Sequence, residues 1–342
     1  MSESAGLPPM VSVDARSSST LRRVLASNTI WIFLVLLGLI AFFSILRPNN
    51  FPTEFNIRAI ATNASVLLVI AVGETFVIIT GGIDLSVGYV LLFSGVCAAQ
   101  VMNAWGDPTD KGWDVIGLGL IVALMAGLAW GVLNGVLVAK ARVSPLIVTL
   151  GTLGMSWGLA QIISGGQDIR YIPSLMSTVL GAGRIVGVPW MVIVAASVAL
   201  TGTILLDLTR FGRYTKGIGS NKEAARRAGI NVDRHLIRVY ALSGLLAGFG
   251  GFLSLAYFTT TTISGHANDN LNAIAAVVIG GASLMGGIGR IWGTVLGALI
   301  LFTVQSGLIM VGVAPDWKKV VVAILIAAAV AAQTLQSKNG RK

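Results

Sequence analysis

Long stretches of apolar residues that carry almost no charge constrain this chain more than any other feature. About ten such runs follow one another, and most approach the roughly 20 apolar residues that an α-helix needs to cross a bilayer. Charged residues make up only 11% of the 342 residues, against about 25% in a typical soluble domain. So little charge cannot cover a water-facing surface. The sequence therefore predicts an all-α fold, a polytopic membrane helix bundle.

The apolar runs predict about ten transmembrane helices. In chain order the predicted spans are residues 29–46, 59–80, 85–102, 115–138, 144–164, 188–206, 239–258, 271–284, 291–313 and 318–333. The eighth run is short and rich in glycine, which indicates a tilted or broken helix.

Lysine and arginine are distributed unevenly between the joints that connect these runs. If the N-terminus is cytoplasmic, 17 of the 24 Lys and Arg residues lie in cytoplasmic joints, whereas the external joint around Asp107, Asp110 and Asp114 is net acidic. Positive residues are enriched on the cytoplasmic side of membrane proteins. The sequence therefore predicts that both termini are cytoplasmic. The same pattern accounts for the net charge of +10 without a nucleic-acid partner.

The domain organisation follows from these spans. We expect a cytoplasmic tail at residues 1–28, a membrane domain at 29–335 with a cytoplasmic coupling loop at 207–238, and a second cytoplasmic tail at 336–342. No joint is long enough for an independent soluble domain. The sequence contains no GxxxxGK[ST] phosphate loop, so we expect no ATP hydrolysis by that route. We also expect no metal, because His235 and His266 lack ligand-spaced partners.

The motif GGIDLSVG, residues 81–88, interrupts the apolar pattern between the second and third runs. Gly81 and Gly82 permit a sharp turn, and Asp84 and Ser86 are residue types that cap helix N-termini. One interpretation is a turn followed by a helix cap. The other is a broken helix that lines the substrate path, because non-helical backbone at membrane depth is tolerated only where protein or a cavity surrounds it. The two are compatible, and the depth of the motif stays open.

Among the polar residues inside predicted spans, three further candidates are Glu74, Asn134 and Gln161. A carboxylate or amide in lipid is costly, so these side chains are expected to face the bundle interior or a cavity. Together with Gly81, Gly82, Asp84 and Ser86 they form the candidate translocation pathway. A proton-coupling role for Glu74 lacks a partnered relay of further acids.

The basic loop 207–238 contains the pattern EAAxxxG, formed by Glu223, Ala224, Ala225 and Gly229. Ala, Glu and Arg favour a helix, which an Asn can begin and a Gly can end. The pattern predicts a short helix at the cytoplasmic surface. The alternative is a basic amphipathic loop that touches anionic lipid.

Five sequence blocks appear in order along the chain: GGIDLSVG, LNGVLVAK (133–140), VSPLIVTLGTLGMSWGLAQIISGG (143–166), EAAxxxG and NAIAAVVIGGASLMGG (272–287). Together they resemble the ribose/xylose-type family of ATP-binding-cassette sugar permeases. The resemblance spans roughly residues 60 to 330. It implies a non-catalytic permease subunit, located in the bacterial inner membrane, that translocates a monosaccharide or a related polyol.

The same resemblance implies partners. It implies a second permease chain, usually an identical copy, an extracytoplasmic sugar-binding protein, and a separate cytoplasmic ATP-binding subunit that uses ATP and Mg. No cofactor is expected in this chain. Glu223, Ala224, Ala225 and Gly229 would belong to the coupling helix that docks on the ATPase. The sequence departs from the family pattern in two respects: the loop lacks a later Leu-Pro pair, and the block before the eighth run carries Asn where relatives often have acids.

Two observations leave alternatives open. The segments 81–88 and 280–287 share two leading glycines, a Leu and a final Gly at the same spacing. They are either two related glycine breaks that flank the pathway or a chance match. The rival functions are an ion-coupled secondary transporter acting alone, for which only Glu74 and Asp84 could serve as acids, and a membrane enzyme, for which no clustered catalytic groups stand out. The sequence leaves the sugar, and the choice of homodimer or heterodimer, open.

Overall fold

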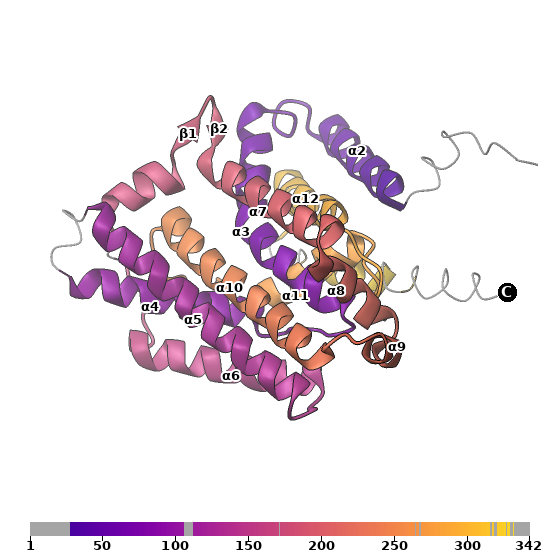
Figure 1. Cartoon of the computed structure of the whole chain (residues 1–342). Helices are drawn as coiled ribbons and strands as arrows, with labels where there is room; N and C mark the ends of the chain where they lie inside the picture. Colours follow the sequence, from indigo (N-terminus) through magenta and orange to yellow (C-terminus); the bar gives the residue numbers. More distant parts are fainter. Residues whose placement is uncertain are drawn as a thin grey trace, which may run out of the picture.

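The chain folds into a bundle of helices (Figure 1). The computed structural model describes residues 28–105, 112–170, 172–263, 265–266, 268–314, 317, 320–325, 327–328 and 331. Within that part, eight helices are long and apolar enough to cross a membrane. They are α2 (Asn28–Leu46), α3 (Glu54–Ile79), α4 (Val87–Ala104), α5 (Trp113–Ala139), α6 (Pro145–Ser164), α7 (Trp190–Leu208), α10 (Val232–Phe258) and α12 (Ile291–Val311).

Shorter elements complete the bundle. They are the π-helix η2 (Met176–Gly181), a hairpin of β1 (Arg184–Ile185) and β2 (Val188–Pro189), and the helices α8 (Arg210–Ser220), α9 (Lys222–Arg227) and α11 (Asp269–Ile279). The polytopic helical fold predicted from composition is confirmed. Nine predicted spans correspond to α2–α7 and α10–α12, with α11 as the short eighth one. The tenth, 318–333, is described in part, at residues 320–325, 327–328 and 331, which are helical. The two tails and the joint near Asp107 lie largely or wholly outside the described residues.

Two helices begin earlier than the apolar pattern indicates. α3 starts at Glu54 instead of residue 59, and α10 starts at Val232 instead of residue 239. In each case a polar side chain caps the helix: Thr53 accepts a hydrogen bond from the N–H of Asn56, and Asn231 accepts one from Arg234. The cap satisfies a free backbone N–H, so the helix extends into polar sequence beyond the apolar run.

The centre of the bundle is α3, whose apolar stretch around Ile70 is fully buried. The closest helix pair is α5 with α10, where glycines face backbone. A Cβ atom at Gly127 or Gly131 would lie 2.2 or 2.3 Å from a carbonyl oxygen of α10. Helices in lipid associate through such close packing, because lipid provides no hydrophobic drive between them. At the edges, α6 packs on α4 and α5, whereas α2 packs on α12 (Figure 1).

The bundle has two distinct ends, joined by α7. The β1–β2 hairpin precedes α7, and α8 and α9 follow it at the opposite end (Figure 1). Loops close the hairpin end: the N–H of Thr261, after α10, donates to the carbonyl of Ile169, after α6 (3.2 Å). The charge pattern of the sequence predicts that the α8–α9 end is cytoplasmic, and we call the hairpin end the outer end.

Helices α3 and α11 end at turns of the same type. α3 ends with Gly81 in the left-handed region (φ 78°), and α11 ends with Gly281 in the same conformation (φ 87°). Both turns have the hydrogen bonds of a Schellman motif. The four bonds are Gly81 N to Ile78 O (2.9 Å), Gly82 N to Val77 O (3.1 Å), Gly281 N to Val278 O (2.9 Å) and Ala282 N to Val277 O (3.2 Å). Helices α6, α9 and α12 end at Gly165, Gly229 and Gly312 with the same pair of hydrogen bonds, so the shared turn by itself does not relate the segments 81–88 and 280–287.

Candidate functional site

A buried polar cluster surrounds the turn after α3. Its centre is Asp84, whose Oδ1 accepts hydrogen bonds from the N–H (3.0 Å) and the hydroxyl (2.6 Å) of Ser86. The backbone N–H of Asp84 donates to Oε1 of Glu74 (3.1 Å), and Nδ2 of Asn134 donates to Oγ of Ser86 (2.9 Å). All four side chains are buried. Four of the candidate pathway residues thus form one hydrogen-bonded network that links α3, α4 and α5.

The location of Asp84 shows how the motif folds. Its N–H reaches Glu74, which lies five residues before the end of α3, or about 7.5 Å along the helix axis at 1.5 Å per residue. The chain therefore turns at Gly81 and Gly82 and runs back along α3 before α4 begins. Such non-helical backbone needs polar partners inside the bundle. The cluster provides them, and this role is compatible with both sequence interpretations of the motif.

Helix α10 contributes two residues that the sequence reasoning did not include. Ser243 donates a long hydrogen bond to Oδ2 of Asp84 (3.5 Å). The hydroxyl of Tyr240 lies over Gly82, where a Cβ atom would be 2.5 Å from it. These two residues stand three apart in an apolar run, so they share a helix face. That spacing was the available signal, but it did not indicate which polar groups the face meets.

Three buried atoms of this cluster have no hydrogen-bond partner among the described residues: Oε2 of Glu74, Oδ1 of Asn134 and the hydroxyl of Tyr240. Buried polar atoms are normally paired, and each exception in a native structure calls for an explanation. The unpaired atoms lie where α3, α5 and α10 meet the turn. They leave hydrogen-bonding capacity that no described residue takes up.

Gln161 is not brought to this cluster. It lies near the outer end of α6, and its Oε1 has no partner in the described part of the chain. The point at which α6 reaches the cluster is Thr149, whose hydroxyl donates to the carbonyl of Ile83 (3.2 Å). Twelve residues of helix separate the two positions, or about 18 Å.

The EAAxxxG pattern forms the short helix α9, at the end of the bundle opposite the β1–β2 hairpin (Figure 1). Oδ1 of Asn221 accepts a hydrogen bond from the N–H of Ala224 (2.9 Å), and Gly229 adopts φ 80° just after the helix. Ala225 is buried in a small apolar cluster. Glu223 is 70% exposed and pairs with Arg226 (3.2 Å). Ala225 thus packs one face of α9 against this cluster, while the side chains of Glu223 and Arg226 are exposed.

Helix α8 connects α9 to both glycine turns. The N–H of Gly287 donates to the carbonyl of Ile79 (2.8 Å), which joins the turn after α11 to the end of α3. Gly219 of α8 packs on this junction, where an added Cβ would lie 1.8 Å from the Ile79 oxygen and 2.5 Å from the Gly287 nitrogen. Only residue 221 separates α8 from α9. Helix α9 is therefore connected through α8 to the turn that precedes Asp84.

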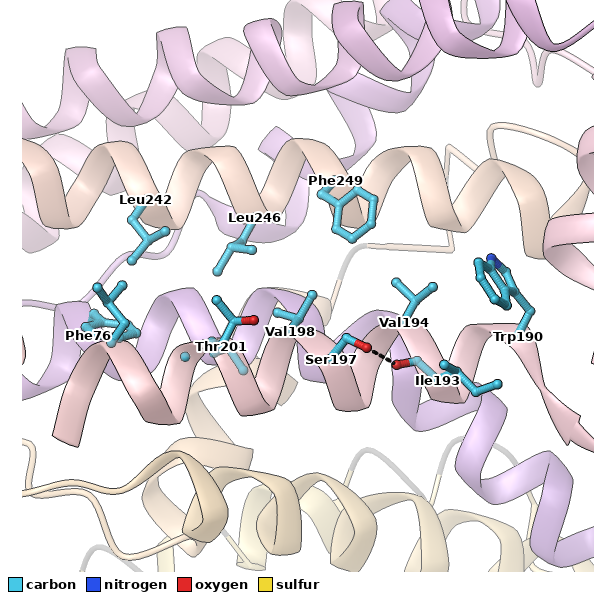
Figure 2. Close-up of a pocket in the computed structure, with 13 residues that line it drawn as sticks. Phe76, Trp190, Ile193, Val194, Ser197, Val198, Thr201, Leu242, Leu246 and Phe249 are labelled. Carbon is cyan, nitrogen blue, oxygen red and sulfur yellow. Dashed lines mark hydrogen bonds between the residues drawn. The ribbon is translucent and has the colours of Figure 1, made fainter. Parts of the chain in front are cut away.

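An apolar groove lies between α7 and α10, with α3 at its back (Figure 2). Its volume is about 410 Å³. Phe76, Leu246 and Phe249 are typical of its lining, and the hydroxyl of Ser197 is taken up by the carbonyl of Ile193 (2.8 Å). A groove with this lining suits an acyl chain and has little to offer a hydroxylated solute. Within the described residues no group of three or more His, Cys, Asp or Glu side chains could hold a metal ion.

The chain is similar in sequence to known transport proteins. The ribose import permease protein RbsC of Escherichia coli K12 is 39% identical over 301 residues, which cover 87% of this chain and 91% of that protein. The D-allose transport system permease protein AlsC of the same strain is 36% identical over 306 residues, 90% of this chain and 91% of its own. The galactose/methyl galactoside import permease protein MglC is 32% identical over 318 residues, 89% and 94%.

No solved structure matches the chain. The family model described as "branched-chain amino acid transport system / permease component" matches residues 56–330. That range contains the buried cluster around Asp84, both glycine turns and helices α8 and α9. The chain, a multi-pass membrane protein, therefore belongs to this family of transport permease components.

Proposed function

We propose that the chain is the permease subunit of an ATP-binding-cassette importer for a monosaccharide or a related polyol. The observation that carries the proposal is the surface helix α9, which is exposed at the cytoplasmic end and is joined through α8 to the turns of the bundle interior. A transporter that works alone has no need of such an element. The relatives that carry sugar names, at 32–39% identity over most of the chain, support a sugar over a branched-chain amino acid as cargo.

The proposed energy source is a separate cytoplasmic ATPase that uses ATP and Mg. Glu223, Ala224, Ala225 and Gly229 present α9 to it, and α8 transmits the displacement to Gly219 and the two glycine turns. Coupling requires the ATPase to bind two states of the permease with different free energies. The Asp84 cluster, with its unpaired polar atoms, is the element that changes between them. In the described conformation its side chains are buried, so they would line the pathway only after a rearrangement.

The proposed partners include an extracytoplasmic sugar-binding protein at the outer end and a second copy of this chain. A face of α6 supports the second copy: Gly154 and Gly158 have open space beside them, and Ile147, Met155 and Ile162 on the same face are exposed. Lipid does not require glycine at a helix surface, whereas a second helix that packs closely does. Gly158→Leu should therefore separate the two copies, as measured by native mass spectrometry.

The ion-coupled alternative is not favoured by the cluster. An ion-coupled transporter coordinates its ion with acids that the ion can reach. Instead, Oδ1 of Asp84 accepts two hydrogen bonds from Ser86, and Oε1 of Glu74 accepts one from the N–H of Asp84. Both acids therefore stabilise the turn in this conformation.

Reconstitution tests the proposal. The permease, the ATPase and the binding protein are placed in proteoliposomes, with labelled D-ribose, D-allose and D-galactose offered outside. We expect uptake that requires Mg-ATP and all three components. Uptake of any of these sugars by the permease alone under a proton or sodium gradient, with no effect of ATP, refutes the proposal.

A further inference from the structure

A second cavity lies in the outer half of the bundle, between α3, α10, α11 and α12. Its volume is about 340 Å³, within the range of small-molecule sites. Asn63 lies nine residues from the outer end of α3, and Gln305 lies six residues from the outer end of α12, or about 14 and 9 Å deep at 1.5 Å per residue. The cavity thus reaches from the outer end into the interior of the bundle.

The side chains that line this cavity differ from those of the apolar groove in Figure 2. They include the amides of Asn63, Asn272 and Gln305, the carboxylate of Asp269 and the aromatic ring of Tyr257. Amides donate to and accept from hydroxyl groups, and a carboxylate accepts from them, while the rings of Tyr and Phe offer flat apolar surface. Neither Lys nor Arg is among the described residues that line the cavity, and these residues include one carboxylate. This chemistry excludes an anion and provides too few charged ligands for a hard cation, which takes six or more oxygens.

Part of the lining is already held in place. The hydroxyl of Tyr257 donates to Oδ1 of Asn63 (3.0 Å). His266 is fixed by Asp269 on Nδ1 (2.7 Å) and by Ser254 on Nε2 (2.8 Å). The Asp269 side chain stays 23% exposed. Because these groups are ordered before a ligand arrives, binding costs less conformational entropy.

The remaining polar groups are free to meet a ligand. The side chains of Asn272 and Gln305 make no hydrogen bond or ion pair to any described residue. Both line the cavity and both are partly exposed to it. An amide without a protein partner in a partly dehydrated cavity is satisfied by water or by the hydroxyls of a solute.

The backbone around the cavity also indicates a solute path. The described residues between the end of α10 and the start of α11 are not helical, and Thr262 and Gly265 among them line the cavity. α11 has 11 residues, about 16 Å, so it cannot span a bilayer of about 30 Å. It begins inside the bundle, where Nδ2 of Asn270 donates to the carbonyl of Leu85 (3.1 Å). Irregular backbone at such depth is tolerated where it lines a water-filled cavity, and this contact joins the cavity floor to the Asp84 turn.

We propose that this outer cavity is a binding site for a neutral polyhydroxylated solute, the sugar cargo after it leaves the binding protein. The proposal rests on the proposed function and adds a site within the permease itself. Asn272 and Gln305 supply the hydrogen bonds, and occupancy of the site is transmitted through Asn270 to the segment that carries Asp84.

The test uses the full-length permease in lipid nanodiscs, with labelled D-ribose, D-allose and D-galactose as probes. The variants are Asn272→Leu and Gln305→Leu, with Asn272→Asp as a change that keeps the side-chain shape. The control is Ser197→Ala in the apolar groove. We expect the wild-type permease to bind at least one sugar, each cavity variant to weaken that binding about tenfold, as expected for one lost hydrogen bond, and the control to bind like the wild type.

A second readout separates this site from the proposed function. In the complete reconstituted importer, the cavity variants should lower the maximal uptake rate. The half-saturating sugar concentration should not change, because the binding protein sets it. Two results overturn the site alone, provided that the wild-type importer takes up sugar normally. One is that the permease binds no sugar, and the other is that binding and uptake are unchanged in all cavity variants. Absence of ATP-driven sugar uptake by the wild-type importer overturns the proposed function as well.

Discussion

Replacing Gly219 by alanine tests whether α8 connects the surface helix to the interior turns. The matched control is Gly217→Ala, two residues earlier in the same helix. A Cβ at Gly217 meets nothing within 4 Å, whereas one at Gly219 lies 1.8 Å from the Ile79 oxygen and 2.5 Å from the Gly287 nitrogen. Both obstacles are backbone atoms of the junction between the two turns, so neither can rotate away.

The two substitutions should change the stability of the protein in opposite directions. Alanine stabilises a helix interior by up to about 1 kcal/mol relative to glycine, and Gly217→Ala should show that gain. At Gly219 the same gain is outweighed by overpacking, which costs about 1–3 kcal/mol, and by weakening of the Gly287–Ile79 hydrogen bond, worth about 0.5–1.5 kcal/mol. We expect Gly219→Ala to be destabilised by about 1–3 kcal/mol and to displace α8 from the turns.

The assays are thermal unfolding in detergent, ATP-driven uptake in proteoliposomes and stimulation of the ATPase by sugar-loaded binding protein. Gly217→Ala should match or exceed the wild type in unfolding temperature and transport normally. Gly219→Ala should unfold earlier and transport slowly even at temperatures where it stays folded, while its ATPase still hydrolyses ATP. Equal behaviour of the two variants in all three assays would refute the reasoning.

Three further predictions concern the surface helix, the buried cluster and the helix packing. Glu223→Lys should abolish co-purification of the ATPase and ATP-driven uptake without lowering the unfolding temperature, because this side chain is 70% exposed; retained co-purification would contradict the placement of the docking surface. Ser86→Ala should cost about 1.5–3 kcal/mol in thermal unfolding, since it removes a hydroxyl donor from the carboxylate of Asp84; an unchanged unfolding temperature would contradict that role. Gly131→Ala should destabilise the protein by about 1–3 kcal/mol through overpacking, because its Cβ would lie 2.3 Å from the carbonyl oxygen of Tyr240. The control Gly117→Ala, on the same helix, should be neutral or stabilising, because a Cβ there meets nothing within 4 Å.

Much of the fold could be predicted because membrane insertion depends on local composition. An apolar run of sufficient length favours a spanning helix whatever lies elsewhere in the chain, so nine predicted spans match observed helices. The helix starts at Glu54 and Val232 were missed because side-chain caps, and not hydrophobicity, determine where a helix begins. In the basic loop, α9 was expected from the EAAxxxG pattern. α8 was not, because its sequence contains three glycines and its stability comes from the turns it packs on.

The polar cluster shows the limit of reasoning along the chain. Glu74, Asp84, Ser86 and Asn134 were each identifiable as polar groups in apolar surroundings, because a buried polar group is costly wherever it lies. Gln161 met the same criterion, yet the structure places it far along α6 from the cluster. Ser243 was overlooked because a lone Ser in an apolar run is unremarkable until its partner, 159 residues earlier, is known.

The sequence by itself determined that the chain is a membrane protein and which apolar segments form its long helices, because those properties follow from the transfer free energy of consecutive residues. Only the tertiary structure decided which polar groups meet. It brought Asn63, Tyr257, Asn272 and Gln305 to one cavity and joined α8 to two turns about 200 residues apart. Such pairings depend on helix rotation and close packing between distant segments, and neither is encoded in any one stretch of the chain.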